Sequence, residues 1–240
     1  MNTILILTIA VVIFALAFDF INGFHDTANA IATSVSTRAL KPRVAVLLAA
    51  SMNFIGALTF VGVAKAIAND IVDPMSLNAF EGDMTGSVVI LAALLSAITW
   101  NLVTWYFGIP SSSSHTLIGS IAGAAIGAAG ISILNYGGFS KIITALIVSP
   151  ILALSVGFIV MSLFKVLFKN LSLYKTNSRF RLLQIGTAAL QAFTHGTNDA
   201  QKAMGIITMA LLAGGLQDTG EVQNWVRVAC ALAMGLGTSV

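Results

Sequence analysis

At residues 20–30 the chain reads Phe20-Ile-Asn-Gly-Phe-His-Asp-Thr-Ala-Asn-Ala30, and at residues 193–203 it reads Phe193-Thr-His-Gly-Thr-Asn-Asp-Ala-Gln-Lys-Ala203. The second stretch lies 173 residues after the first and repeats its Phe, Gly, Asp and final Ala at matching positions. Both are polar islands, because apolar segments precede and follow them. Aspartate and histidine inside apolar sequence need a physical reason, so the prediction of the fold begins here.

Composition indicates that most of the surface faces lipid. Of the 240 residues, 57% are hydrophobic and only 9% are charged, and the mean hydropathy is +0.93. Soluble domains carry about 25% charged residues, so a soluble globular protein is excluded. Lipid permits only helices or closed barrels, and the apolar segments lack the alternation of barrel strands. The predicted fold class is an all-α integral membrane protein.

Loop charges predict the orientation in the membrane. The positive-inside rule places two basic clusters in the cytoplasm: Arg38, Lys41 and Arg43, and then Lys165, Lys169, Lys175, Arg179 and Arg181. The acidic residues of the other connections are then outside: Asp70, Asp73, Glu81, Asp83, Asp218 and Glu221. The N-terminus is also placed outside, and residues 1–18, which lack a basic signal-peptide start, are expected to remain as the first span. Since the two clusters account for the net charge of +3, we expect no nucleic-acid partner.

In this orientation the two polar islands lie in spans of opposite direction. Residues 3–37 cross inward and residues 182–213 cross outward, each interrupted by its island. Related sequences in opposite orientations indicate an inverted-topology repeat, whose broken helices meet near the middle of the bilayer around a substrate. We expect a first repeat at 1–168, a basic cytoplasmic loop at 169–181 and the start of a second repeat at 182–240. This organisation is typical of secondary transporters.

Asp26 and Asp199 occupy equivalent positions in the two islands. A carboxylate inside a membrane span is costly unless it has a partner, so both are predicted to hold a coupling proton, a sodium ion or a counter-ion. The alternative is a structural role as caps of broken helices. His25 is predicted to relay protons or to donate a hydrogen bond. Asp19 either faces a water-filled vestibule or pairs with a polar neighbour.

Amide and amine side chains accompany the two aspartates. The carbonyl oxygens of Asn22, Asn29 and Asn198 suit a sodium ion or a protonated acid, and these residues could equally cap half-helices. Lys202 stands where the first island has Asn29. It is predicted to pair with Asp199 or to face an anionic substrate, and the alternative is a lysine that extends toward the interface.

A third polar island reads Gly108-Ile-Pro-Ser-Ser-Ser-Ser-His-Thr-Leu-Ile-Gly119 and contains no formal charge. Proline cannot continue a helix and serine is a favoured N-cap, so a half-helix is predicted to begin within 111–114. Its free N–H groups, its dipole and the hydroxyls would form an anion site at the tip of a re-entrant hairpin at about 100–119. A solvent loop is the alternative, and loop charges do not separate a re-entrant hairpin from two full crossings.

Three motifs together, at 22–30, 100–119 and 195–203, resemble those of the PiT family of inorganic phosphate transporters. The resemblance is to the bacterial low-affinity branch. It implies symport of phosphate, often as a metal–phosphate complex, with protons, whereas other branches use sodium. It also implies a homodimer in the bacterial cytoplasmic membrane. Family members have a second hairpin of the form Pro-x-Ser-Thr-Thr-His, which these 240 residues lack, so 182–240 is expected to be only the opening of the second repeat.

The resemblance implies that the two islands line the path of ion and substrate and that Ser112 to Thr116 hold phosphate oxygens. With the residue chemistry above, it leads to the following predicted roles. Phosphate oxygens would be held by Ser112, Ser113, Ser114, His115, Thr116, Asn22 and Lys202. The coupling ion would be held by His25, Asp26, Asn29, Asn198 and Asp199, and the metal ligands of a sodium-coupled transporter would be Asp26 and Asp199.

Two other functions share these residue types. The same fold could carry another tetrahedral oxyanion, such as sulfate or arsenate. An intramembrane serine hydrolase would use a serine nucleophile and a histidine base, but His115 adjoins Ser114 in sequence, so the base would have to be His25 or His195. No ATP-binding, dinucleotide-binding or HExxH motif occurs, and the single Cys230 excludes a disulfide framework. We therefore expect no cofactor, no enzymatic activity and transport driven by an ion gradient.

Overall fold

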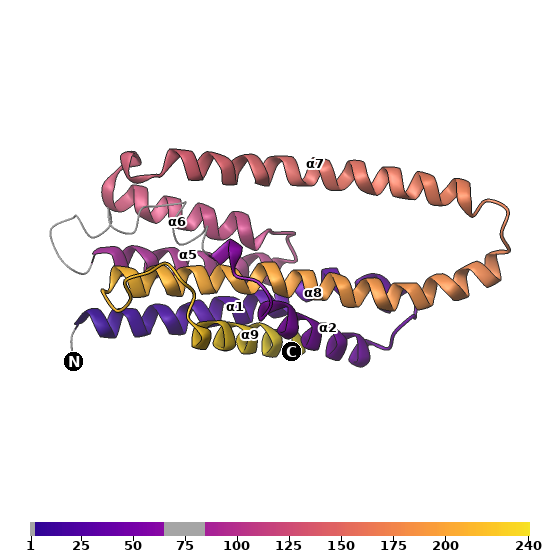
Figure 1. Ribbon diagram of the computed structural model, residues 1–240, viewed down its shortest axis with the longest axis horizontal. Helices are drawn as coiled ribbons and strands as arrows, with labels where there is room; N and C mark the ends of the chain where they lie inside the picture. The colour runs from indigo at the N-terminus through magenta and orange to yellow at the C-terminus, as the bar shows by residue number, and fades with distance from the viewer. Residues whose placement is uncertain (1–2, 65–84) are drawn as a thin grey trace.

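The computed structural model describes residues 3–64 and 85–240 (Figure 1). The secondary-structure elements of these two ranges are all helical, as predicted. They are α1 (Thr3–Ser36), α2 (Pro42–Ala57), α5 (Thr85–Phe107), α6 (Ser113–Ala129), the 3-10 helix η1 (Ile131–Ile133), α7 (Tyr136–Leu167), α8 (Leu173–Ala213) and α9 (Asn224–Ser239). The predicted acidic connection with Asp70, Asp73, Glu81 and Asp83 lies outside the described residues.

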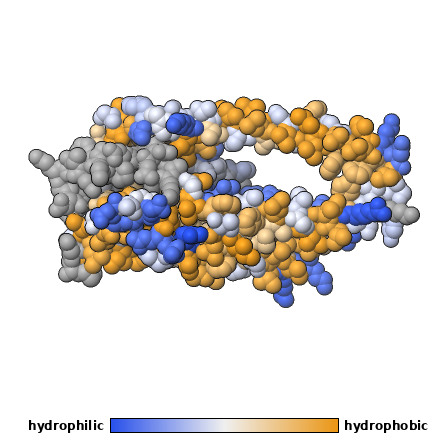
Figure 2. Space-filling model, viewed as in Figure 1, coloured by the Kyte–Doolittle hydropathy of each residue, from blue (hydrophilic) through white to orange (hydrophobic). Residues whose placement is uncertain are grey.

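Three of the described helices are long and apolar enough to cross a membrane: α1, α5 from Gly86 onward, and α7. Hydrophobic residues cover most of the visible surface of α7, and blue polar residues gather near its two ends (Figure 2). Along α7 only Gly138 is buried, and Figure 2 shows an opening between α7 and the rest of the protein. The chain is therefore a multi-pass membrane protein of the all-α class.

The predicted helix breaks at the two polar islands are wrong. The helix α1 continues through residues 20–30, and α8 continues through residues 193–203 without a change of conformation. Neither island contains proline, and polar side chains do not interrupt the backbone ladder when they find partners on neighbouring helices. The islands therefore interrupt hydropathy, not the helices.

The helices α1 and α8 are antiparallel and lie side by side (Figure 1). Thr37 at the end of α1 donates to Gln184 near the start of α8, with 2.6 Å between the oxygens. At the opposite end, a Cβ placed on Gly214 would lie 2.8 Å from the Thr8 hydroxyl. This register places the two islands opposite each other. The antiparallel direction of α1 and α8 is the one that an inverted repeat requires. The repeat itself stays a prediction.

Glycine lets α1 cross α9 at very short range. A Cβ on Gly23 would lie 2.6 Å from the carbonyl oxygen of Met234, and a Cβ on Gly237 would overlap the carbonyl oxygen of Phe20. Small residues at such crossings allow backbones to approach closely in a membrane, where packing and hydrogen bonds drive helix association. Gly23 is one of the residues shared by the two islands.

The equivalent glycine of the second island makes the same kind of contact with α2. A Cβ on Gly196 would overlap the backbone of Asn53, and a Cβ on Gly56 would overlap the carbonyl oxygen of Phe193. Each island helix is thus pressed against a short helix at its own island, α1 against α9 and α8 against α2. These two crossings hold the polar side chains of the islands at fixed positions.

The hairpin of α5 and α6 ends part of the way along the longer helices (Figure 1). As predicted, the second helix begins within 111–114: α6 starts at Ser113, and the Ser112 hydroxyl caps it by accepting from the N–H of His115. The two helices extend over 85–129, so the hairpin is longer than the predicted 100–119. Core residues that anchor it to α1 and α8 include Phe18, Leu94, Leu117 and Met204.

The two basic clusters lie at one end of the molecule. The guanidinium Nη2 of Arg181 donates to the carbonyl oxygen of Arg38 at 2.8 Å, which joins the two clusters directly. The predicted basic loop at 169–181 is shorter than expected, because α7 ends at Leu167 and α8 begins at Leu173. The side of the membrane on which this end lies stays a prediction.

We expect Gly237→Ala to destabilise the protein by about 1–3 kcal/mol, because the new methyl group overpacks the α1–α9 crossing. The Tm of the purified protein in detergent measures this. Gly157→Ala is the matched control, because nothing lies within 4 Å of a Cβ at Gly157 and alanine favours an α-helix. Equal Tm values for the two variants would contradict the close crossing.

Candidate functional site

The carboxylate of Asp199 lies where α1 and α8 face each other. Asn22 donates from Nδ2 to its Oδ2 at 2.8 Å, and the ammonium of Lys202 lies 3.0 Å from its Oδ1. His195 brings Nε2 to 3.3 Å from Oδ2. The Asp199 side chain is only 13% exposed. Lys202 therefore pairs with Asp199, which was one of its predicted roles, and it is buried. Its role in binding an anionic substrate stays a prediction.

Asp26 lies beside it, with partners from α1 and from the hairpin. The ring Nδ1 of His25 lies 2.8 Å from Asp26 Oδ1. The hydroxyl of Ser113, the first residue of α6, donates to Asp26 Oδ2 at 3.1 Å. Two carboxylates from equivalent positions of the islands thus meet at the tip of the serine hairpin.

Ser113 joins the groups of this site to one another. Its hydroxyl oxygen accepts a hydrogen bond from Lys202 Nζ at 2.7 Å and lies 3.5 Å from Asp199 Oδ2. A hydroxyl has one proton to donate and can accept as well, so Ser113 accepts from Lys202 while it donates to a carboxylate. We call the whole set the aspartate cluster; it consists of Asn22, His25, Asp26, Ser113, His195, Asp199 and Lys202.

Three members of the aspartate cluster have the geometry of a cation site. One ligand atom from each of Asp26, His195 and Asp199 lies within 4.8 Å of the others. Oxygen and nitrogen ligands lie about 2.0–2.6 Å from a bound cation, so ligands at this mutual distance can share one ion. His195 is held in orientation by Asn53 of α2, whose Oδ1 lies 3.2 Å from Nδ1.

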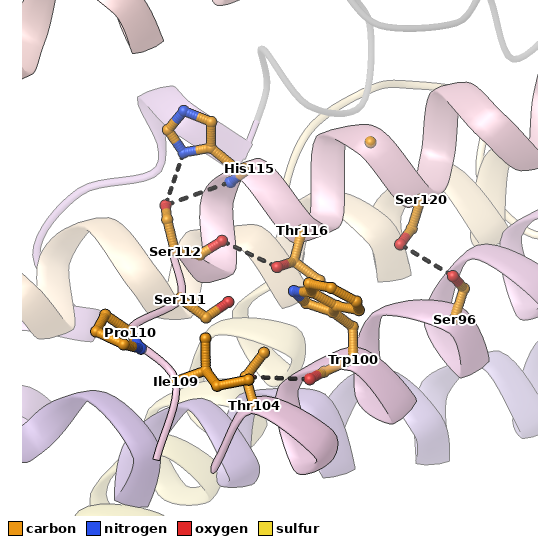
Figure 3. Close-up of a pocket in the computed structure, with 11 residues that line it drawn as sticks. Ser96, Trp100, Thr104, Ile109, Pro110, Ser111, Ser112, His115, Thr116 and Ser120 are labelled. Carbon is orange, nitrogen blue, oxygen red and sulfur yellow. Dashed lines mark hydrogen bonds between the residues drawn. The ribbon is translucent and has the colours of Figure 1, made fainter. Parts of the chain in front are cut away.

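On another side of the hairpin tip lies an open groove of about 530 Å³ between α5 and α6 (Figure 3). Its walls contain serine hydroxyls, aromatic surface and the first turn of α6; they include Trp100, Thr104, Pro110, Ser111, Ser112, His115 and Thr116. His115 is exposed, and its Nδ1 lies 2.8 Å from the Ser112 hydroxyl. The groove offers hydroxyl groups and the positive end of a helix dipole to an anion.

The structure divides the five hairpin residues predicted to bind phosphate. Ser113 faces the aspartate cluster, whereas Ser112, His115 and Thr116 line the open groove. The Thr116 hydroxyl donates to the carbonyl oxygen of Ser112 at 3.0 Å. Ser114 is half-buried on the same turn. The hairpin tip therefore separates two polar regions that the sequence had suggested as one.

The side chains of two predicted ion-binding residues are open to solvent. Asn29 and Asn198 are both exposed, and the carboxamide of Gln191 donates to the backbone oxygen of Asn29, not to its side chain. Their ion-binding role stays a prediction.

Sequence reasoning missed Asn53, which contacts His195 and donates to the Thr238 hydroxyl at 2.8 Å. An asparagine within the apolar sequence of α2 was the signal that could have found it.

The sequence of this chain is similar to those of known phosphate transporters. The model of the phosphate transporter family matches residues 22–240. A probable low-affinity inorganic phosphate transporter of Bacillus subtilis is 67% identical over 241 residues, which cover all of this chain and 71% of the relative. The corresponding protein of Mycobacterium tuberculosis H37Rv is 45% identical, and the match covers 99% of this chain and 56% of that protein. Low-affinity inorganic phosphate transporter PitB of Escherichia coli K12 is 38% identical over 92% of this chain and 48% of its own length.

A solved structure has the same fold. It is described as a sodium-dependent phosphate transporter and superposes with a TM-score of 0.77 at 21% identity, covering 97% of this chain and 75% of the other. The family and these relatives are transporters, so the chain is not an enzyme and the serine hydrolase alternative falls away. The extent of the family match and the 67% identity to the Bacillus protein establish that this chain belongs to the phosphate transporter family.

Proposed function

We propose that the protein imports inorganic phosphate through the bacterial cytoplasmic membrane as a secondary transporter driven by a cation gradient. The observation that carries this proposal is the contact of Ser113, at the N-terminus of α6, with Asp26 and Lys202. An anion-binding helix tip here touches the two groups of opposite charge that a coupled transporter of anions needs. The family match and the names of the relatives support phosphate as the anion.

Phosphate would bind at the start of α6. The N–H groups of the first helical turn and the hydroxyls of Ser112, Ser113, Ser114 and Thr116 are donors that suit phosphate oxygens. His115 adds a ring donor in the groove. Lys202, at 2.7 Å from Ser113, would supply the positive charge, and Asn22 would hold the aspartate cluster in register.

Charge explains why phosphate needs a cation. Asp26 and Asp199 carry two negative charges against the single positive charge of Lys202 when the histidines are neutral. At a separation of about 4 Å, two like charges repel by about 4 kcal/mol at an effective dielectric constant of about 20. A cation bound at the carboxylates removes this repulsion, and by linkage phosphate favours cation binding to the same extent. Proton or sodium symport follows from this reciprocity.

The triad of Asp26, His195 and Asp199 also suits a divalent metal carried together with phosphate. Imidazole nitrogen is a poor ligand for sodium and a good one for transition metals, while carboxylates suit magnesium and manganese. A metal–phosphate complex would place its metal on the triad and its oxygens on the hairpin. This supports the metal–phosphate form of the cargo that the family resemblance implies.

The antiparallel α1 and α8 support an alternating-access cycle. In this proposal the repeat 1–168 and the repeat that opens at 182–240 rock around the aspartate cluster, so that the hairpin tip faces each side in turn. The protein would function as a homodimer with its N-terminus outside. The chain spans 71% of the length of the Bacillus relative and 56% of the mycobacterial one. The activity of the whole transporter is therefore part of this proposal.

We expect Asp26→Asn to abolish gradient-driven uptake of labelled phosphate into proteoliposomes, because the amide no longer carries the charge that a cation neutralises. Uptake is measured under an imposed proton gradient and then a sodium gradient, with excess sulfate and excess arsenate as competitors. Inhibition by arsenate but not by sulfate is expected of a phosphate site.

Asp218→Asn is the matched control, since it makes the same chemical change in the exposed connection between α8 and α9. Its uptake should stay within about twofold of the parent protein, as surface substitutions away from packed or charged contacts have little effect. Full accumulation by Asp26→Asn, or no accumulation by the parent protein under either gradient, would refute the proposal.

We expect His195→Asn to weaken the metal dependence of uptake. The position equivalent to His195 in the first island already holds an asparagine, Asn22. Loss of one ligand should raise the concentration of magnesium or manganese that gives half-maximal uptake by about tenfold. The KM for phosphate at saturating metal should change little. An unchanged metal requirement would remove His195 from the cargo site.

Lys202→Met should destabilise the protein by about 3–5 kcal/mol, because it leaves the Asp199 carboxylate buried and uncompensated. The double variant Lys202→Met with Asp199→Asn should regain most of the lost stability, as measured by the Tm in detergent. Phosphate uptake should stay low in both variants if Lys202 binds phosphate. A double variant as unstable as the single one would show that the ion pair is not the source of the loss.

A further inference from the structure

A second buried carboxylate lies outside the aspartate cluster. Asp19 precedes Asp26 by about two turns of α1 and is completely buried. Neither of its carboxylate oxygens has a hydrogen-bond partner among the described residues. The fully buried Val11, Ala15 and Phe18 precede it on α1. An unpartnered carboxylate in such a place is among the most costly features that a membrane protein can retain.

Two asparagines, one on α1 and one on α5, leave further buried polar atoms unpartnered. Asn22 uses its Nδ2 on Asp199 and leaves its buried Oδ1 without a partner. It lies three residues after Asp19, on the same face of α1. Asn101 of α5 is 1% exposed, and neither its Oδ1 nor its Nδ2 has a partner in the described structure.

Asn101 lies at the level of Asp19 in the bundle. The helices α1 and α5 are in contact and run in the same direction (Figure 1). The rings of Phe24 on α1 and Trp105 on α5 pack with their centroids 5.5 Å apart. One turn earlier on each helix stand Phe20 and Asn101, and Asp19 adjoins Phe20. The unpartnered groups thus gather in one layer of the interior.

We propose that Asp19, Asn22 and Asn101 form a second site for a monovalent cation, either a sodium ion or a proton. The unpartnered atoms are four oxygens and one amide nitrogen, so acceptors greatly outnumber donors. Carboxylate and amide oxygens are the hard ligands that sodium takes, and a proton on Asp19 would instead donate to an amide oxygen. Either cation supplies the positive charge that these unpartnered oxygens lack.

The neighbouring charged groups do not fill this role. Asp199 and Lys202 of α8 act electrostatically on Asp19, and Asp19 in turn acts on the thiol of Cys230 of α9. The ammonium of Lys202 is directed to Asp199 and Ser113, at 3.0 and 2.7 Å. With Asp19 included, three carboxylates face one lysine. This second site would add one coupling cation per cycle, and in that respect it rests on the proposed function.

Binding is tested first, because it does not depend on transport. The purified chain in lipid nanodiscs is titrated with radioactive sodium against a choline background, and infrared difference spectra are recorded across a pH series without sodium. A sodium site gives one bound ion that Asp19→Asn removes while binding at the aspartate cluster persists. A proton site gives the carbonyl stretch of a carboxylic acid, and Asp19→Asn removes that band.

Controls separate this site from the aspartate cluster and from simple misfolding. Asp26→Asn should leave the Asp19 signal in place, and Asp218→Asn should leave all signals in place. Asn101→Ala keeps the carboxylate and loses one oxygen ligand. It should weaken sodium binding about tenfold or shift the pH midpoint of the infrared band. If Asp19→Asn does not fold, Asn101→Ala decides the question alone, because a purely structural amide would leave cation binding unchanged.

Transport then measures the coupling. In proteoliposomes, Asp19→Asn should lower the number of cations moved per phosphate by one, while exchange of internal for external phosphate continues. The second site would be overturned if the binding signals persist unchanged in both Asp19→Asn and Asn101→Ala. An unchanged ratio of cations to phosphate in Asp19→Asn would also overturn it. A parent protein that binds the cation at Asp19 but takes up no phosphate would refute the proposed function and leave the second site standing.

Discussion

The ion pair between Lys202 and Asp199, joined to Asp26 through the hydroxyl of Ser113, is the interaction on which the rest of the arrangement depends. Charged groups inside a membrane must satisfy one another, since lipid offers them nothing. The two carboxylates and the lysine therefore determine that α1, α8 and the tip of α6 meet. A helix hairpin that stops part of the way along its neighbours is stable here because its polar end has partners.

Close packing makes these contacts possible. Gly23 and Gly196 stand at equivalent positions in the two islands, and each lets a short helix press against the backbone beside the charged side chains. Without a Cβ at these positions, α9 packs directly on α1 and α2 packs directly on α8. The glycines of the motif thus permit close helix packing, while the aspartates near them form the aspartate cluster.

The same geometry relates binding to coupling. The cluster has more negative than positive charge, and the hairpin tip that suits phosphate is in hydrogen-bond contact with it. In the proposed cycle, such a site would hold an anion well only when cations are present. Asp19 adds a third buried carboxylate on α1, and the second site proposed there would increase the number of cations that accompany each anion.

Sequence alone determined the class of the protein, the equivalence of the two islands and the start of α6 within 111–114, and it offered the pairing of Lys202 with Asp199 as one of several roles. These properties are local or follow from composition, because hydropathy, helix caps and spacing along one helix need no knowledge of neighbours. Only the tertiary structure decided that α1 and α8 continue unbroken and that Ser113 faces the aspartates while Ser112 and His115 face a groove. It also decided that Asn29 and Asn198 are exposed and that Asn53 contacts His195. Each of these depends on which helix lies opposite, and in a membrane that choice is made by close packing and hydrogen bonding between distant segments.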